Sequence, residues 1–235
     1  MIGVVGTDAG AVTAALDATG ESTRSGTPEY VLEGDPDAVV AVGTSPVSDL
    51  LRDRPIPDVP ILAVDAGDGF PAVADLTDAV ANLGAGRYTT VEYPVFGVAA
   101  GGTHVGNAVF DTMVVTSDPG RISEFRIVSE SELGAVRADG VIVATPAGSH
   151  GYVRAAGGPR LCPETDVAVV VPIAAFTMSP DHWVVGLDAP VTITSERDVP
   201  VSLLLDDERR ELRPDHSVTV AVRDTIAFVS PEIGE

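Results

Sequence analysis

A chain of 235 residues, 45% of them hydrophobic, is long enough to bury one large core or two small ones, which excludes an intrinsically disordered protein. Its 35 acidic residues against 14 basic ones give a formal net charge of −21 and a pI near 4.3. A field of that sign repels nucleic acid and anionic lipid, so neither is expected as a partner.

Every basic residue is an arginine, and lysine is absent. An acidic surface of this kind suits a halophilic protein, because salt screens the repulsion between its charges; a GC-rich genome that favours arginine codons is a second reading, and the two can coexist. The single Cys162 excludes an internal disulfide and a cysteine-rich metal site, and no apolar run is long enough to span a membrane. We therefore expect a cytoplasmic protein.

The first eighty-odd residues alternate between short β-branched runs and helix-forming segments, which predicts a doubly wound α/β domain. In such a sheet, ligand loops lie at the carboxyl ends of the strands. The expected strands are Ile2–Val5, Val31–Leu32 (weakly), Ala38–Val42 and Pro60–Val64, and the expected helices are Ala9–Ala18, Val47–Arg52 and Asp75–Leu83. Thr44 and Ser45 are the candidate caps of the second helix.

The pattern changes after the glycines at 84 and 86 to short runs rich in valine, isoleucine and threonine, which predicts a mostly antiparallel β domain. We expect domains at residues 1–86 and 87–225, with residues 226–235 a candidate return to the first domain. Residues 206–211 read as a solvated hairpin turn, and one helical turn is expected near Tyr152–Ala156. The expected strands are Tyr88–Tyr93, Val95–Ala99, Thr112–Thr116, Glu124–Val128, Val141–Thr145, Val167–Val171, His182–Leu187, Val191–Thr194, Val201–Leu205, Ser217–Val222 and Ile226–Val229.

One stretch, Asp139 to Pro159, joins an apolar strand to a loop of small hydroxyl and glycine residues and ends in Gly-Gly-Pro. Glycine lets backbone N–H groups approach a ligand closely. The stretch reads Asp-Gly-Val-Ile-Val-Ala-Thr-Pro-Ala-Gly-Ser-His-Gly-Tyr and then Ala-Gly-Gly-Pro, and it resembles the D-G-L-I-V-S-T-P-T-G-S-T-A-Y and S-A-G-G-P segment of the NAD kinase family. The Asp-Ala-Gly-x-x-Phe loop at 65–70 and Pro172-Ile173 follow the family's order.

This resemblance implies an α/β domain followed by a β domain, with NAD lying between them. It implies transfer of a phosphoryl group from ATP or polyphosphate to the 2′-hydroxyl of NAD, with Mg²⁺ accompanying the nucleotide. It also implies a homo-oligomer, a dimer or a tetramer. The NAD side would comprise Asp111, Thr112, Asp139, Thr145, Ala147, Gly148, Ser149, His150 and Tyr152. The phosphate side would comprise Gly43, Thr44, Gly67 and Phe70.

The segment that should carry the catalytic base departs from the family. Its G-G-D-G-T motif is replaced by Gly43-Thr44-Ser45-Pro46-Val47, which places Ser45 at the aspartate position. A serine is not a base near neutral pH, and a proline removes one N–H from the loop. Asp68, in the neighbouring strand-end loop, is the candidate replacement for the lost carboxylate.

Two further departures touch the NAD side. Asp111 and Thr112 stand where the family has Asn followed by Glu or Asp, and an ionised Asp accepts hydrogen bonds where Asn also donates them. His150 replaces a threonine and, when protonated, would favour an anionic ligand.

These departures keep an alternative open: a catalytically silent nucleotide-binding or regulatory homologue. A third reading takes Ala147-Gly148-Ser149-His150-Gly151 as an approximate nucleophile elbow, with His182 or His216 as base. The four histidines have no paired spacing, so no resident metal site is expected.

Overall fold

The computed structural model describes residues 1–7, 9–52, 55–118, 121–213 and 217–231. The chain divides into two compact units, Met1–Tyr93 with Thr225–Glu235, and Pro94–Asp224. We describe each unit by itself.

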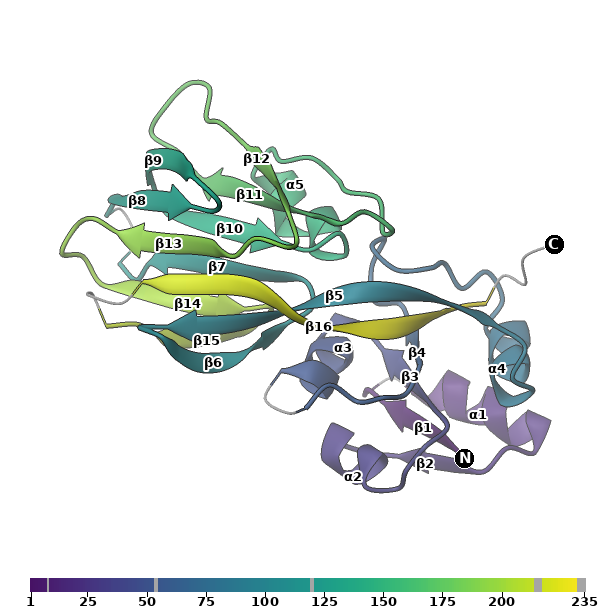
Figure 1. The fold of residues 1–235 in the computed structure, drawn as a ribbon. Helices are drawn as coiled ribbons and strands as arrows, with labels where there is room; N and C mark the ends of the chain where they lie inside the picture. Colours follow the sequence, from purple (N-terminus) through teal and green to yellow (C-terminus); the bar gives the residue numbers. More distant parts are fainter. Residues whose placement is uncertain (8, 53–54, 119–120, 214–216, 232–235) are drawn as a thin grey trace. The chain divides into compact units, whose positions relative to one another are not determined.

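The first unit is a parallel sheet covered by helices. Strand β1 (Ile2–Val5) lies between β2 (Thr23–Ser25) and β3 (Ala38–Val42), and β3 pairs with β4 (Ile61–Val64). The last strand, β16 (Val218–Ser230), pairs in parallel with β4 through Phe228 and Ile61. The helices are α1 (Gly10–Thr19), α2 (Pro28–Leu32), α3 (Thr44–Leu51) and α4 (Leu76–Gly84), as Figure 1 shows.

Both faces of this sheet are buried, which explains its continuously apolar strands. Alternate side chains such as Val4, Val40 and Leu62 pack with Val12 and Leu16 of α1 and with α4. Helix α2 approaches the strands so closely that a Cβ added at Gly3 would lie 2.3 Å from Val31 Cγ1.

The strand predicted at Val31–Leu32 is wrong, because these residues form the end of α2. The Thr27 side chain accepts a hydrogen bond from Tyr30 N at 3.4 Å, and Pro28 occupies the first turn. A threonine cap followed by proline starts a helix, and these local signals outweigh the β-branched preference of Val31.

The second unit consists of two antiparallel sheets. In one sheet β16 pairs with β13, β13 with β8 and β8 with β9, and β5 pairs with β6; the other has the order β12-β11-β10-β7-β14-β15. The strands are β5 (Thr89–Ala100), β6 (Thr103–Ala108), β7 (Asp111–Thr116), β8 (Ser123–Val128), β9 (Glu132–Ala138), β10 (Gly140–Ala144), β11 (Val167–Ile173), β12 (Trp183–Gly186), β13 (Val191–Ser195), β14 (Val201–Leu205) and β15 (Glu208–Glu211). A short 3₁₀ turn, η1 (Gly148–His150), and α5 (Tyr152–Ala155) follow β10.

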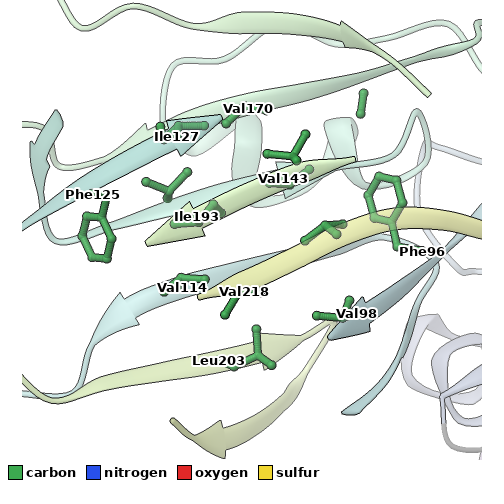
Figure 2. Packing of buried hydrophobic residues seen from close by; sticks show 14 of the residues in the cluster. Phe96, Val98, Val114, Phe125, Ile127, Val143, Val170, Ile193, Leu203 and Val218 are labelled. Carbon is green, nitrogen blue, oxygen red and sulfur yellow. The ribbon is translucent and has the colours of Figure 1, made fainter. Parts of the chain in front are cut away.

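The inner faces of the two sheets share one apolar core, drawn in Figure 2. Phe125, Ile127 and Ile193 come from one sheet, and Val143 and Leu203 from the other; all five are at most 1% exposed. The outer face of β10 and β11 packs instead on Val153 and Leu161, which holds the segment after β10 against the sheet.

The predicted fold class, an α/β domain followed by a mostly antiparallel β domain, is confirmed. The sequence missed β2, β6, β9 and β15, and it split β5 and β16 into two runs each. Proline and charged residues interrupt the apolar pattern inside these long strands, so the apolar runs understate their length. No helix in the part of the chain that the structure describes is both long and apolar enough to cross a membrane.

Candidate functional site

Thr145, at the end of β10, ties the loop that follows it to the segment before β7. It is fully buried, and its Oγ1 lies 2.6 Å from Val109 O and 3.1 Å from Phe110 O. Its backbone N donates to Phe110 O at 2.9 Å, and Gly148 N donates to Thr145 Oγ1 at 3.2 Å. Val109, Phe110 and the loop after Thr145 are thus parts of one hydrogen-bonded structure.

Gly148 is required by close packing. A Cβ at this position would lie 1.9 Å from Phe110 O and 2.4 Å from Phe110 C, both backbone atoms. The neighbouring Ala147 is 3% exposed. Small residues at 147 and 148 therefore let the loop lie directly on the backbone of the 109–111 segment.

Ser149 and His150 fasten the other side of the loop to Leu161. The Ser149 hydroxyl, fully buried, donates to Pro146 O at 2.7 Å and accepts from Leu161 N at 2.8 Å. His150 Nε2 donates to Leu161 O at 3.1 Å, and His150 Nδ1 is buried with no hydrogen-bond partner among the described residues. A serine so engaged is not placed for nucleophilic attack, so the nucleophile-elbow reading is wrong; His216 lies outside the described residues.

Asp111 and Thr112 begin β7 and are buried, at 6% and 0% exposed. Asp111 Oδ1 and Thr112 Oγ1 have no hydrogen-bond partner within the described ranges. Burial, and secondarily the nearby Asp206 carboxylate, raises the pKa of Asp111 well above its usual 3.8. The acid form, which both donates and accepts, therefore persists to higher pH and reproduces the capacity of an asparagine amide.

The remaining predicted residues of this unit lie at the two ends of the loop region. Asp139 is half-buried directly before β10, where its backbone carbonyl accepts from Thr116 N at 2.8 Å. Tyr152 starts α5 with its side chain 48% exposed. Thr145 and the loop after it are thus packed against the 109–111 segment, which contains Asp111, while the Tyr152 ring is half exposed.

In the first unit, the segment at the catalytic-base position forms the start of α3. Gly43, with φ of 98°, is the N-cap residue, and its N donates to Val64 O at 2.8 Å. Thr44 and Ser45 are exposed and lie in the helix, so the predicted role of either as a cap is wrong. Gly43 takes that place because its φ is open to glycine and strained for a side chain. The helix has neither a side-chain cap nor an acidic residue in its first turn.

The loop after β4 forms a pocket of about 540 Å³ within the first unit, and Asp65 and Asp68 line it as exposed side chains. Gly67, with φ of 99°, has open space where a Cβ would lie. Phe70 also lines the pocket, but its ring is largely buried against Phe228, with ring centroids 4.4 Å apart. The loop is therefore anchored by Phe70 and leaves both carboxylates free to face solvent or ligand.

No group of three or more His, Cys, Asp or Glu side chains in the described ranges is arranged to hold a metal ion. The carboxylates of Asp65 and Asp68 are oxygen ligands of the kind that Mg²⁺ accepts when phosphates and water complete its shell. The residues present thus suit a magnesium ion that arrives with a nucleotide.

Parts of this chain are similar in sequence to proteins of one known family. The model of the ATP-NAD kinase C-terminal domain matches residues 110–227. The NAD kinase of Pyrococcus furiosus is 32% identical over 195 residues, which are 80% of this chain and 70% of the relative. The chain belongs to the NAD kinase family.

Other relatives and solved structures agree with the family assignment. The NAD kinase of Methanopyrus kandleri is 34% identical over 141 residues, but the match spans only 51% of that relative's length. Yeast NADH kinase, solved with NADH, superposes with a TM-score of 0.80 at 17% identity, covering 98% of this chain and 83% of the other. An NAD kinase from Archaeoglobus fulgidus, solved with ATP, gives 0.77 at 19% identity, covering 99% and 94%. This family member therefore has the family's fold throughout.

One residue near Asp111 was not singled out from the sequence. Asp206 was expected in a solvated turn, and the turn does join β14 to β15, but its side chain is half-buried and accepts three backbone N–H bonds from residues 109, 110 and 111. Its partners lie about a hundred residues away, so no local pattern reveals them. Its φ of 53° is consistent with the usual tolerance of aspartate for left-handed turns.

Proposed function

We propose that this protein is an NAD kinase that transfers a phosphoryl group from ATP or polyphosphate to the 2′-hydroxyl of NAD, giving NADP. The observation that carries the proposal is the Thr145–Tyr152 loop clamped onto the 109–111 segment, with the buried polar pair Asp111 and Thr112 beside it. Family membership and the neighbours solved with NADH and with ATP support it.

On the NAD side, the adenosine would be held where Asp111 Oδ1 and Thr112 Oγ1 have no hydrogen-bond partner among the residues that the structure describes. Asp111 in its acid form supplies one donor and one acceptor, as the family's asparagine does. Tyr152 would stack on the ligand through its exposed ring, and Asp139 would contribute from the half-buried position before β10. Ala147, Gly148, Ser149 and His150 would shape the loop, because their close packing and hydrogen bonds determine its path.

On the phosphate side, Gly43 and Thr44 would present the uncapped N-terminus of α3 to phosphate oxygens. Phosphoryl transfer of this type depends mainly on positioning and charge stabilisation, with a carboxylate to orient the attacking hydroxyl. Ser45 cannot fill that role near neutral pH, so we assign it to Asp68, which is exposed in the pocket that Gly67 and Phe70 also line. Magnesium, when bound with the nucleotide, neutralises the phosphate charge.

A second function has one observation in its favour. The first turn of α3 contains no acidic residue and a proline in place of an N–H donor, so the position of the family's base is empty of carboxylate. A silent homologue that binds and senses NAD or NADP would show this combination of an intact binding loop and an altered catalytic segment.

One assay separates the two functions. The purified protein, kept in molar KCl to suit its charge, is incubated with NAD, Mg²⁺ and either ATP or polyphosphate, and NADP is measured by chromatography. NADP formation with either donor supports the kinase and identifies the donor. Binding of NAD or NADP by calorimetry without product would refute the kinase and establish the silent homologue. Size-exclusion chromatography of the same sample tests the homo-oligomer, dimer or tetramer, which we propose with a cytoplasmic location.

A further inference from the structure

Asp206 makes an arrangement of hydrogen bonds unlike that of an ordinary turn residue. Its Oδ1 accepts from Phe110 N at 2.8 Å and from Asp111 N at 3.0 Å, and its Oδ2 accepts from Val109 N at 3.2 Å. Its own backbone N donates to Asp111 O at 2.9 Å. One residue of the β14–β15 hairpin thus accepts hydrogen bonds from the N–H groups of three successive residues.

The carbonyl side of the same peptide units is occupied by the other loop. Thr145 binds Val109 O and Phe110 O through its hydroxyl, and Gly148 lies against Phe110 O. The 109–111 segment is therefore held from both sides, by Asp206 through its N–H groups and by Thr145 and Gly148 through its carbonyls. Nothing in the segment itself explains its conformation, because Val109 and Phe110 have no turn-forming side chains.

We propose that Asp206 is a positioning residue of the nucleotide site: by holding the backbone of residues 109–111 it sets the place of Asp111 and Thr112, without touching the ligand itself. The inference rests on the proposed function for the identity of the ligand, but the hold on residues 109–111 stands on the hydrogen bonds alone. Hydrogen bonds to an ionised carboxylate are about twice as strong as neutral ones, so a single side chain can determine the path of a short segment.

The carboxylate has a second effect on the site. Asp111 is buried beside Asp206, and two carboxylates so placed do not readily ionise together. The three N–H bonds stabilise negative charge on Asp206, and this nearby charge adds to the effect of burial in raising the pKa of Asp111. The same residue thus places Asp111 and favours the form of it that can donate a hydrogen bond.

The test compares two substitutions at the position. Asp206→Asn keeps one oxygen acceptor and replaces the other with an NH₂ group that opposes an N–H donor, while Asp206→Ala removes all three bonds. We expect the affinity for NAD, measured by calorimetry, to fall about tenfold in Asp206→Asn and about a hundredfold in Asp206→Ala. If the enzyme is active, KM for NAD rises by similar factors while kcat changes less than threefold or so, since the loss is of ground-state placement.

Amide hydrogen exchange followed by NMR gives a readout that needs no ligand. In Asp206→Asn the amides of Val109, Phe110 and Asp111 should lose protection, while those of β10 keep theirs. Asp207→Asn removes an exposed carboxylate from the same turn and should change neither quantity. Ile193→Val, in β13 of the same unit's core, lowers stability by removing a buried methylene and so controls for a general loss of stability.

The exchange and binding results test different parts of the proposal. Undiminished protection of the three amides in Asp206→Asn would overturn the hold on the segment. Lost protection with unchanged NAD affinity would overturn the positioning role. If the wild-type chain binds neither NAD nor NADP, the proposed function fails, and the exchange data still decide whether Asp206 holds residues 109–111.

Discussion

The loop after β10 and the start of α3 differ in how firmly the rest of the protein constrains them. Thr145 and Gly148 are buried, bonded to a neighbouring backbone and intolerant of added atoms. Thr44 and Ser45 are exposed at a helix start that makes no side-chain cap. Substitution in the loop would disturb the packing of its unit, whereas substitution at the helix start costs the fold little. The loop at Thr145–Tyr152 can thus keep the family's sequence while the segment at Gly43–Val47, far from it in the sequence, departs from it.

The largest effect is expected at Asp68, to which we assign the role of the family's catalytic aspartate. Asp68→Asn should lower kcat for NADP formation about a hundredfold or more, because the attacking hydroxyl loses the carboxylate that orients it. The affinity for NAD, measured by calorimetry, should stay within about threefold of wild type if Asp68 acts in the chemical step.

Asp65→Asn is the matched control, since Asp65 lines the same pocket and asparagine tolerates its φ of 52°. A much smaller loss in Asp65→Asn would assign the role to one carboxylate instead of the charge of the pocket. Equal losses in both variants, or none in Asp68→Asn, would contradict this assignment. Ser45→Asp, which restores the family residue, should then recover activity in the Asp68→Asn background.

In the loop after β10, a steric clash should weaken both ligand binding and folding. Gly148→Ala places a Cβ 1.9 Å from Phe110 O, so the loop or the 109–111 segment must move. We expect NAD binding to weaken at least tenfold and the free energy of unfolding to fall by about 1–3 kcal/mol, as for overpacked cores. Calorimetry and urea denaturation measure the two.

Gly10→Ala serves as the control for adding a methyl group to a glycine. Gly10 begins α1, and a Cβ there would meet no atom within 4 Å. This variant should bind NAD as wild type does and be slightly more stable, because alanine favours helix. Wild-type binding by Gly148→Ala would show that the close packing of the loop is not needed for the site.

A smaller effect is expected from Asp111→Asn, which restores the family's residue. The pKa of Asp111 is raised in the folded protein, so as pH rises above about 4 the unfolded chain loses this proton first and folding becomes less favourable, until pH passes the folded-state pKa. Asparagine does not titrate, so the variant should gain stability over wild type as pH rises through that window and then keep the gain.

The affinity for NAD should also depend on whether Asp111 is protonated. Wild-type affinity for NAD should decline as pH rises through the folded-state pKa of Asp111, and the decline should be absent in Asp111→Asn. Urea denaturation and calorimetry over a pH series upward from 4 measure both differences. A wild-type protein whose stability advantage over the variant grows with pH would mean that Asp111 is ionised when folded.

Much of the fold was predictable because local patterns and burial agree. The strands Ala38–Val42 and Gly140–Ala144 are continuously apolar, and they are buried as their patterns predict. The strand at Val31–Leu32 was predicted wrongly because two apolar residues are a weaker signal for a strand than Thr27-Pro28 is for the start of a helix. Strands β6 and β15 were missed because strands with few large apolar residues depend on their partners for pairing.

The candidate site was predictable only in part, for a physical reason. Gly148 and Ser149 could be singled out because the stretch Asp139–Pro159 resembles the family's segment; the close packing that requires Gly148 is seen only in the structure. Asp206 could not, because its carboxylate meets amides 95 to 97 residues away and any turn accepts an aspartate. The altered pKa of Asp111 likewise results from burial and from Asp206, and neither is visible in the residues around it.

The smallest effect is expected from the negative surface charge of the whole protein. With a net charge of −21, the unfolding temperature should rise by several degrees between 0.1 and 2 M KCl, because the screening length falls from about 10 Å to about 2 Å and repulsion between carboxylates weakens. The stability lost in Gly148→Ala should be the same at both concentrations, since a steric clash is not screened. An unfolding temperature that does not change with KCl would assign the acidic, lysine-free composition to codon usage alone. A Gly148→Ala loss that disappears in high salt would show that charge, and not packing, limits the loop.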